Sequence, residues 1–298
     1  MKSEALALII LPVAFAALFA QAPAMPAEYQ QVLTTLARTG DFRDNVLKVN
    51  IPRTDVKVTV AGVATPTPFG FGGWVAMTPA TGGHQVLMGD LVLLQEEVNP
   101  VMSALLAAGF DVTALHNHFF WDEPRMLYMH VHGHGAADDL ARRLKPAIDL
   151  IGAGRTASAA ASVPAAGSLN TARLAEIVGR PGDQSGPVYK FTIGRADLNV
   201  TEMGAVINAR MGLNSWAAFT GTDASAAIAG DVAMLESEVT PVLKILRQHN
   251  LDVVAIHHHM TNGRPMIIFL HYWGTGPAER LAVGFKAALD ALGKSGRD

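Results

Sequence analysis

An internal duplication constrains the fold of this chain more than any other feature of its sequence. The strings ALHNHFFWDEPRMLYMHVHGHG and AIHHHMTNGRPMIIFLHYWGTG align without a gap, and around them residues 38–151 match residues 180–292. A length of 298 residues also suits about two domains of ordinary size. The chain is therefore predicted to fold as two homologous repeats.

The repeats are predicted to be α+β domains. The sequence pattern divides the chain into a segment 1–24, repeat 1 at 28–151, an Ala/Ser/Gly-rich linker at 152–170 and repeat 2 at 171–292. Each repeat reads as helix, four strands, helix, two strands and helix. The first turn is placed at Gly40-Asp41 or Gly182-Asp183, and the fourth strand is expected to end at Gly89-Asp90 or Gly230-Asp231. We expect two mostly antiparallel sheets with covering helices, packed as a pseudo-twofold pair.

Three histidines are retained in both copies. His116, His118 and His130 align with His257, His259 and His271, so each copy keeps His-x-His, eleven residues and a third His. Alternate side chains of a strand share a face, with Cα atoms roughly 6.5 to 7 Å apart. A hairpin that turns symmetrically around residues 121–124 would place His116 opposite His130. Three such imidazoles predict a site for a divalent transition metal, zinc first, with a fourth coordination position open.

The two copies differ around this trio. Repeat 1 adds His132 and His134, where repeat 2 has Trp273 and Thr275, and repeat 2 has His258 in place of Asn117. Repeat 1 is therefore the better furnished copy for metal binding. The predicted ligands are His116, His118, His130, His132, His134, His257, His259 and His271. The alternative is that these histidines are structural members of a buried strand pair.

Several carboxylates and aromatic residues are also repeated. Glu97 and Glu238 begin a helix, and each is a candidate fourth ligand or acid/base, although an acidic residue there also complements the helix dipole. The other repeated carboxylates are Asp55/Asp197, Asp90/Asp231 and Asp111/Asp252. Arg53-x-Asp55 and Arg195-x-Asp197 indicate a structural ion pair, with an anion clamp as the alternative. Trp74 and Trp216 are interpreted as core aromatic residues, and the less favoured alternative is that they form the wall of a ligand site.

Composition narrows the chemistry. The chain has no cysteine, which excludes disulfides, thiolate metal ligands and a cysteine nucleophile, so any metal must bind nitrogen and oxygen atoms. The formal net charge of −3 gives no electrostatic footprint for nucleic acid, and none is expected as a partner.

Residues 1–24 are typical of a cleaved signal peptide. Lys2 precedes an apolar run, residues 5–20, that only Pro12 interrupts, and small residues follow at Ala22 and Ala24. The run is short for a membrane span, so an uncleaved anchor is the less favoured alternative. We expect a periplasmic or secreted protein whose mature chain has no transmembrane segment.

Two resemblances add to this interpretation. In the strings PRTDVKVTVAGV, MGDLVLLQEEVNPVMSALLAAG and TALHNHFFWDEPRMLYMHVHGHG, the chain resembles the LppY/LpqO family of bacterial envelope proteins, which implies export but no reaction. The histidine spacing alone is also similar to the metal site of acetolactate decarboxylases. That similarity implies a zinc-polarised carbonyl, with His116, His118 and His130 as ligands and Glu97 as a fourth ligand or base.

These observations favour an exported metal-binding protein. A metalloenzyme that acts on a small substrate is the more specific version of this hypothesis. The alternative is a non-catalytic envelope module that binds a small molecule or a cell-envelope component, with structural histidines. A carrier that buffers a transition metal would share the same ligands. The sequence leaves open the metal, the reaction and the oligomeric state.

Overall fold

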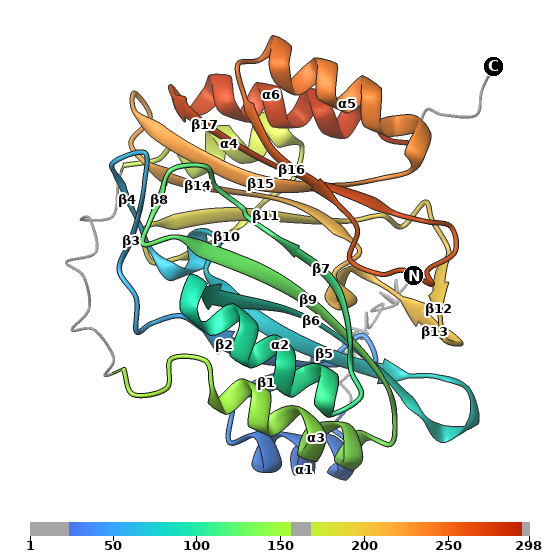
Figure 1. Cartoon of the computed structure of the whole chain (residues 1–298). Helices are drawn as coiled ribbons and strands as arrows, with labels where there is room; N and C mark the ends of the chain where they lie inside the picture. Colours follow the sequence, from blue (N-terminus) through green and yellow to red (C-terminus); the bar gives the residue numbers. More distant parts are fainter. Residues whose placement is uncertain (1–23, 156–167, 294–298) are drawn as a thin grey trace, which may run out of the picture.

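The fold is a stack of four layers, in which two sheets lie face to face between two groups of helices (Figure 1). The computed structural model describes residues 24–155 and 168–293; the predicted signal segment falls almost wholly outside these ranges, as does most of the linker. The helices are α1 (Ala27–Leu36), α2 (Val98–Ala107), α3 (Ala137–Asp149), α4 (Thr171–Val178), α5 (Glu236–Gln248) and α6 (Ala278–Asp290). Among the described residues, no helix combines the length and apolar character needed to cross a membrane.

Each repeat forms a six-stranded antiparallel sheet, and the strand order is the same in both. In repeat 1 the order is β1 (Gly40–Arg43), β2 (Val46–Pro52), β5 (Gly72–Pro79), β6 (Gln85–Leu94), β9 (Met126–Gly135) and β7 (Asp111–His116). In repeat 2 it is β10 (Asp183–Ser185), β11 (Val188–Gly194), β14 (Asn214–Gly221), β15 (Ala226–Met234), β17 (Ile268–Gly276) and β16 (Asp252–His257). The predicted α+β fold of two repeats, packed as a pseudo-twofold pair, is confirmed.

Short elements extend from the sheets. They are the sheet β4 (Val63–Thr65), β3 (Val58–Val60) and β8 (Asp122–Glu123), the hairpin β12 (Val200–Glu202) and β13 (Ala205–Ile207), and the 3-10 helices η1 (Thr67–Phe69), η2 (Thr81–Gly83), η3 (Gln95–Glu97) and η4 (Ala209–Met211). The turn η1 of repeat 1 packs on β11 and β14, and η4 of repeat 2 packs on β2 and β5. Each repeat thus reaches over the sheet of the other, which fixes how the two sheets face.

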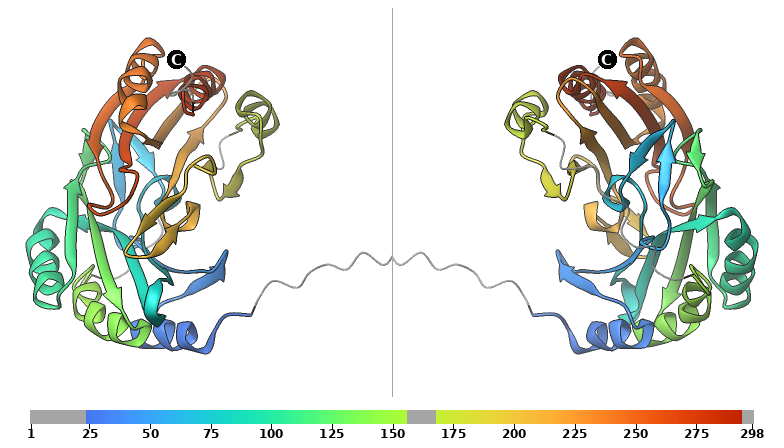
Figure 2. Two further views of the ribbon diagram at one scale, coloured as in Figure 1. Left: turned by 90° about the vertical axis from the view of Figure 1, so that its right-hand side faces the viewer. Right: turned by 90° about the vertical axis from the view of Figure 1, so that its left-hand side faces the viewer.

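The outer face of each sheet is covered by helices of its own repeat (Figure 2). In α3, Leu140, Leu144 and Ile148 recur every four residues, as an amphipathic helix requires, and all three are fully buried. The inner faces form a second core that joins the repeats, where Phe69 and Phe119 meet Trp273. Much of each inner face is buried, so the histidines on it contact other protein groups more than solvent.

Two details of the predicted strands are wrong. The Gly40-Asp41 pair lies within β1, and the turn is formed by Asp44 and Asn45, whose φ angles of 51° and 62° are left-handed. The Gly89-Asp90 pair lies in the middle of β6. Glycine stands there because a Cβ at Gly89 would come within 2.8 Å of both Val75 and Val131, so the pair marks close packing inside a strand and not its end.

Candidate metal centre

A row of directly paired residues, which includes an aspartate and a histidine, crosses the inner face of each sheet. In repeat 1 the directly paired residues are Asn50, Trp74, Asp90, His130 and Ala114; in repeat 2 they are Thr192, Trp216, Asp231, His271 and Ala255. Paired residues of antiparallel strands point to the same face, so each row carries its histidine inward. The pseudo-twofold packing turns the two rows toward each other.

Six imidazoles gather where the rows meet. His116 and His257 occupy equivalent positions in the two repeats, and their rings stack with centroids 3.8 Å apart. His118 approaches His271 to 3.6 Å between ring centroids, and the equivalent pair, His259 and His130, to 4.0 Å. The centre is therefore built by both repeats together.

Aromatic packing fixes the second histidine of each His-x-His. His118 stacks on Tyr128 with ring centroids 3.3 Å apart, and His259 stacks on Phe269 at 3.4 Å. Both histidines are buried, at 5% and 6% exposure, although they lie just beyond the ends of β7 and β16. Stacking thus holds these rings in place where the sheet no longer does.

Backbone hydrogen bonds orient the third histidine of each repeat. Nδ1 of His130 lies 3.2 Å from the Gly89 carbonyl oxygen, and Nδ1 of His271 lies 3.1 Å from that of Gly230. A carbonyl oxygen only accepts, so each Nδ1 carries the hydrogen and each Nε2 keeps its lone pair. This is the arrangement by which proteins hold a metal-binding imidazole, with the other ring nitrogen donating to a carbonyl.

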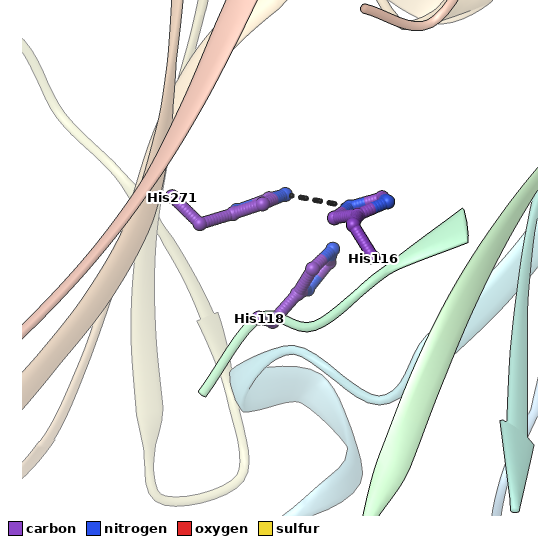
Figure 3. A group of neighbouring side chains, drawn as sticks. All are labelled: His116, His118 and His271. Carbon is purple, nitrogen blue, oxygen red and sulfur yellow. Dashed lines mark hydrogen bonds between the residues drawn. The ribbon is translucent and has the colours of Figure 1, made fainter. Parts of the chain in front are cut away.

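Many nitrogen atoms of this cluster have no hydrogen-bond partner among the described residues. They are His116 Nδ1, His130 Nε2, His259 Nδ1 and both ring nitrogens of His118 and His257. Figure 3 shows His116, His118 and His271, among which Nε2 of His116 lies 3.2 Å from Nε2 of His271. Two nitrogens bound to one tetrahedral zinc lie roughly 3.3 Å apart, given Zn–N bonds of roughly 2.0 to 2.1 Å. The spacing fits ligands of a shared ion.

Three groups of side chains place ligand atoms within 4.8 Å of one another: His116/His118/His271, His116/His130/His257 and Asp231/His257/His259. The first two draw on both repeats, and the third adds a carboxylate. Within the described residues the structure therefore contains several buried groups able to hold a metal ion.

Burial keeps the cluster neutral. It lowers the pKa of His116 to about 3 and holds the pKa of His118, His130, His257, His259 and His271 well below the usual histidine range. For His118 and His257, repulsion from neighbouring imidazoles adds to the effect. Burial also raises the pKa of Asp90 to about 7 and that of Asp231 well above its usual range. Neutral imidazole is the form that binds a metal.

The arrangement differs from the predicted one in register and in ligand grouping. His116 pairs with Tyr128 and His130 pairs with Ala114, so the register differs by two residues from one in which His116 lies opposite His130. The expected trio His116, His118 and His130 of a single repeat is not one of the three groups. In the first group His271 from the other sheet takes the third position, and its ring centroid lies 3.6 Å from that of His118.

His132 and His134 lie outside these groups. The His132 Nδ1 atom lies 2.9 Å from Oε1 of the buried Glu202, without hydrogen-bond alignment, and His134 Nδ1 lies 3.4 Å from Nδ1 of His84. The extra histidines of repeat 1 thus extend along β9 away from the cluster. Each meets a different partner.

Glu97 and Glu238 belong to ion pairs and not to the histidine groups. Arg53 uses its five N–H donors on Asp55, Glu97 and the Val92 carbonyl oxygen. Glu97 in turn accepts from the backbone N–H groups of Leu94 and Gly152. Its carboxylate is fully engaged, which leaves no support for the base or ligand role implied by the likeness to acetolactate decarboxylases. Arg195, Asp197 and Glu238 repeat the pattern in the second copy.

Other members of the site were visible in the sequence as repeated residues without a role. Asp231 joins a metal group, with Oδ2 lying 3.7 Å from Nε2 of His259. Lys48 and Lys190 line a cavity beside the cluster, together with Trp74 and Trp216. Lys48 aligns with Lys190 in the two copies, as Trp74 does with Trp216, but only the fold shows that these residues lie beside the histidines.

Comparison with known proteins gives a family without a described activity. Among solved structures, a double-ringed trimeric shell protein of the RMM microcompartment matches over 70% of this chain and 83% of that chain, at 14% identity and a TM-score of 0.18, which is too low to bear on fold or function. No curated protein matches. A family profile matches residues 30–150 and again 172–291, once for each repeat. The chain therefore belongs to the family described as Domain of Unknown Function (DUF1259), of which it contains two tandem copies.

Proposed function

We propose that this protein binds a divalent transition metal at a centre shared by its two repeats, and that the bound metal acts on a small substrate. The observation that carries the proposal is the convergence of buried imidazoles from both sheets with ring nitrogens that have no partner among the described residues. A buried polar atom without a partner costs about 1 to 3 kcal/mol, which a metal bond would offset.

The ligand chemistry favours a transition metal, and zinc is the first candidate. The donor atoms are imidazole nitrogens with one carboxylate nearby, a set suited to Zn, Cu, Ni or Fe and poor for Mg or Ca. A group of three imidazoles leaves a coordination position for water or substrate. A metal held in this way polarises a bound oxygen atom or lowers the pKa of bound water. The protein residues supply neutral ligands, fixed ring orientations and a buried setting.

The proposal includes export to the periplasm or beyond. Two predictions support it: the signal peptide at residues 1–24 and the resemblance to the LppY/LpqO envelope proteins. The domain limits 28–151 and 171–292 and the wider list of histidine ligands are likewise proposals.

The test is elemental analysis of purified protein after exposure to Zn, Cu, Ni, Mn and Fe. The wild type should retain metal in stoichiometric amount, and the double variant His116→Ala/His130→Ala should lose it. His258→Asn is the matched control, since repeat 1 has Asn117 at that position. A wild type that retains none of these metals would refute the proposal and favour structural histidines.

A further inference from the structure

A cavity of about 340 Å³ lies beside the histidine cluster, and its lining repeats the pseudo-twofold relation. Its paired members are Lys48/Lys190, Trp74/Trp216, Asp90/Asp231 and His118/His259, with His271 beside them. Asn50 and Gly72 in the lining are exposed, so the cavity reaches the surface. A larger cavity of about 670 Å³ contains none of the histidines and one ionisable side chain, Asp252.

Two ammonium groups in this cavity have no acceptor among the described residues. Nζ of Lys48 lies 4.2 Å from the centre of the Trp74 ring, and Nζ of Lys190 lies 4.2 Å from that of Trp216. Neither lysine forms an ion pair or side-chain hydrogen bond within the part of the chain that the structure describes, although both are half-buried. Burial lowers the pKa of each lysine only to about 8, so both remain protonated at neutral pH. Asp90 raises the pKa of both lysines but forms no ion pair with either, so the two ammonium groups can accept an anionic ligand.

The same cavity offers an acceptor without a donor. Asp90 is half-buried, and its Oδ1 atom is shielded from solvent and has no hydrogen-bond partner among the described residues. A hydroxyl group would satisfy it as a donor. The indole faces of Trp74 and Trp216 suit the carbon skeleton of a ligand.

We propose that the cavity binds a small hydroxylated carboxylate, whose carboxylate lies between Lys48 and Lys190 and whose hydroxyl groups reach Asp90. This ligand is the substrate class of the metal centre, so in that respect the inference rests on the proposed function. Its recognition, however, depends on the lysines and not on the metal ligands. Metal-free protein should therefore bind such acids as well, and metal should strengthen the binding.

The experiment is calorimetric titration of metal-loaded and metal-free protein with glucuronate and gluconate, each compared with its neutral counterpart, glucose or glucitol. The acids should bind and the neutral counterparts should not. Lys48→Met and Lys190→Met keep an apolar stem on the indole while removing the charge, and each should weaken acid binding roughly tenfold or more, with metal content unchanged. Lys244→Met, at an exposed position of α5, is the control and should bind as the wild type does.

The outcomes separate the two proposals. If neither acid binds more tightly than its neutral counterpart, in either form of the protein, the cavity proposal is overturned whatever the metal content; this comparison requires no variant to fold. It also fails if both lysine variants, shown to be folded by circular dichroism, bind acids as the wild type does. If the protein takes up no metal and yet binds acids through Lys48 and Lys190, the metal proposal fails while this one stands.

Discussion

The Nε2 atoms of His116 and His271 lie 3.2 Å apart, although 155 positions separate the two residues along the chain. One belongs to the edge strand of the first sheet and the other to an inner strand of the second (Figure 3). A metal bound between them would join the two repeats, so removal of a ligand from either repeat should weaken the same site.

His271→Ala should therefore reduce metal affinity as much as His116→Ala does. The expected loss is roughly tenfold to a hundredfold or more, since even residues that only orient metal ligands contribute that much. Equilibrium dialysis against a metal buffer measures it, with His258→Asn as the control. Undiminished affinity in His271→Ala would mean that the metal is held without the His116/His118/His271 group.

The ion-pair network of Glu238 should serve stability and not metal binding. Its carboxylate is fully buried and contacts Arg195, Leu235 N–H and Gly293 N–H, so Glu238→Gln leaves the buried Arg195 with only the more exposed Asp197 as its counter-charge. We expect a loss of about 1 to 3 kcal/mol in the free energy of unfolding, measured in urea, with unchanged metal content. The exposed Glu236→Gln should change stability by less than about 0.5 kcal/mol. Loss of metal from a folded Glu238→Gln protein would contradict this separation.

Metal-free protein should lose stability as the pH falls from 7.5 to 5. The folded pKa values of the six clustered histidines are depressed, so below pH 6.5 the unfolded chain binds more protons, and each histidine contributes up to roughly 1.4 kcal/mol per pH unit. Asp90 and Asp231 act in the opposite direction, because their folded pKa values are raised and they take up protons in the folded state.

The histidines outnumber these two carboxyl groups, so the net slope should be positive. Urea unfolding at several pH values measures it. His118→Gln should make the slope shallower, whereas the control His258→Asn should leave it nearly as in the wild type. A flat profile over this range would show that the cluster is protonated in the folded protein.

Gly230 should tolerate no side chain. A Cβ there would collide with the Tyr272 hydroxyl and with the backbone carbonyl of Trp216, which cannot move without disturbing the sheet. Gly230→Ala should therefore cost about 1 to 3 kcal/mol or more in thermal or urea unfolding. Gly72→Ala is the control, since a Cβ at Gly72 meets nothing within 4 Å. Equal stability of the two variants would contradict the packing explanation of the Gly-Asp pair.

The sequence was sufficient for the repeats, the sheets and the histidine face, because strand alternation and duplication are local signals. It could not place His271 beside His116, since no periodicity within a repeat encodes how two sheets dock. The hairpin also pairs His116 with Tyr128, a register that the expected symmetric turn does not give. For Glu97, its position at a helix start was correct, but its partner Arg53 lies 44 positions away in the chain. Lys48 and Lys190 occupy equivalent positions in the two copies, but only the cavity suggests a role for them.

His132 lies against Glu202 of the other repeat, whereas its counterpart Trp273 packs on Phe69 with ring centroids 5.9 Å apart. In a dimer of identical chains every substitution appears twice, on both sides of the axis. Two copies joined in one polypeptide are free of that constraint, and here one side has exchanged a polar contact for an aromatic one. Fusion thus allows the two halves of a symmetric scaffold to specialise independently.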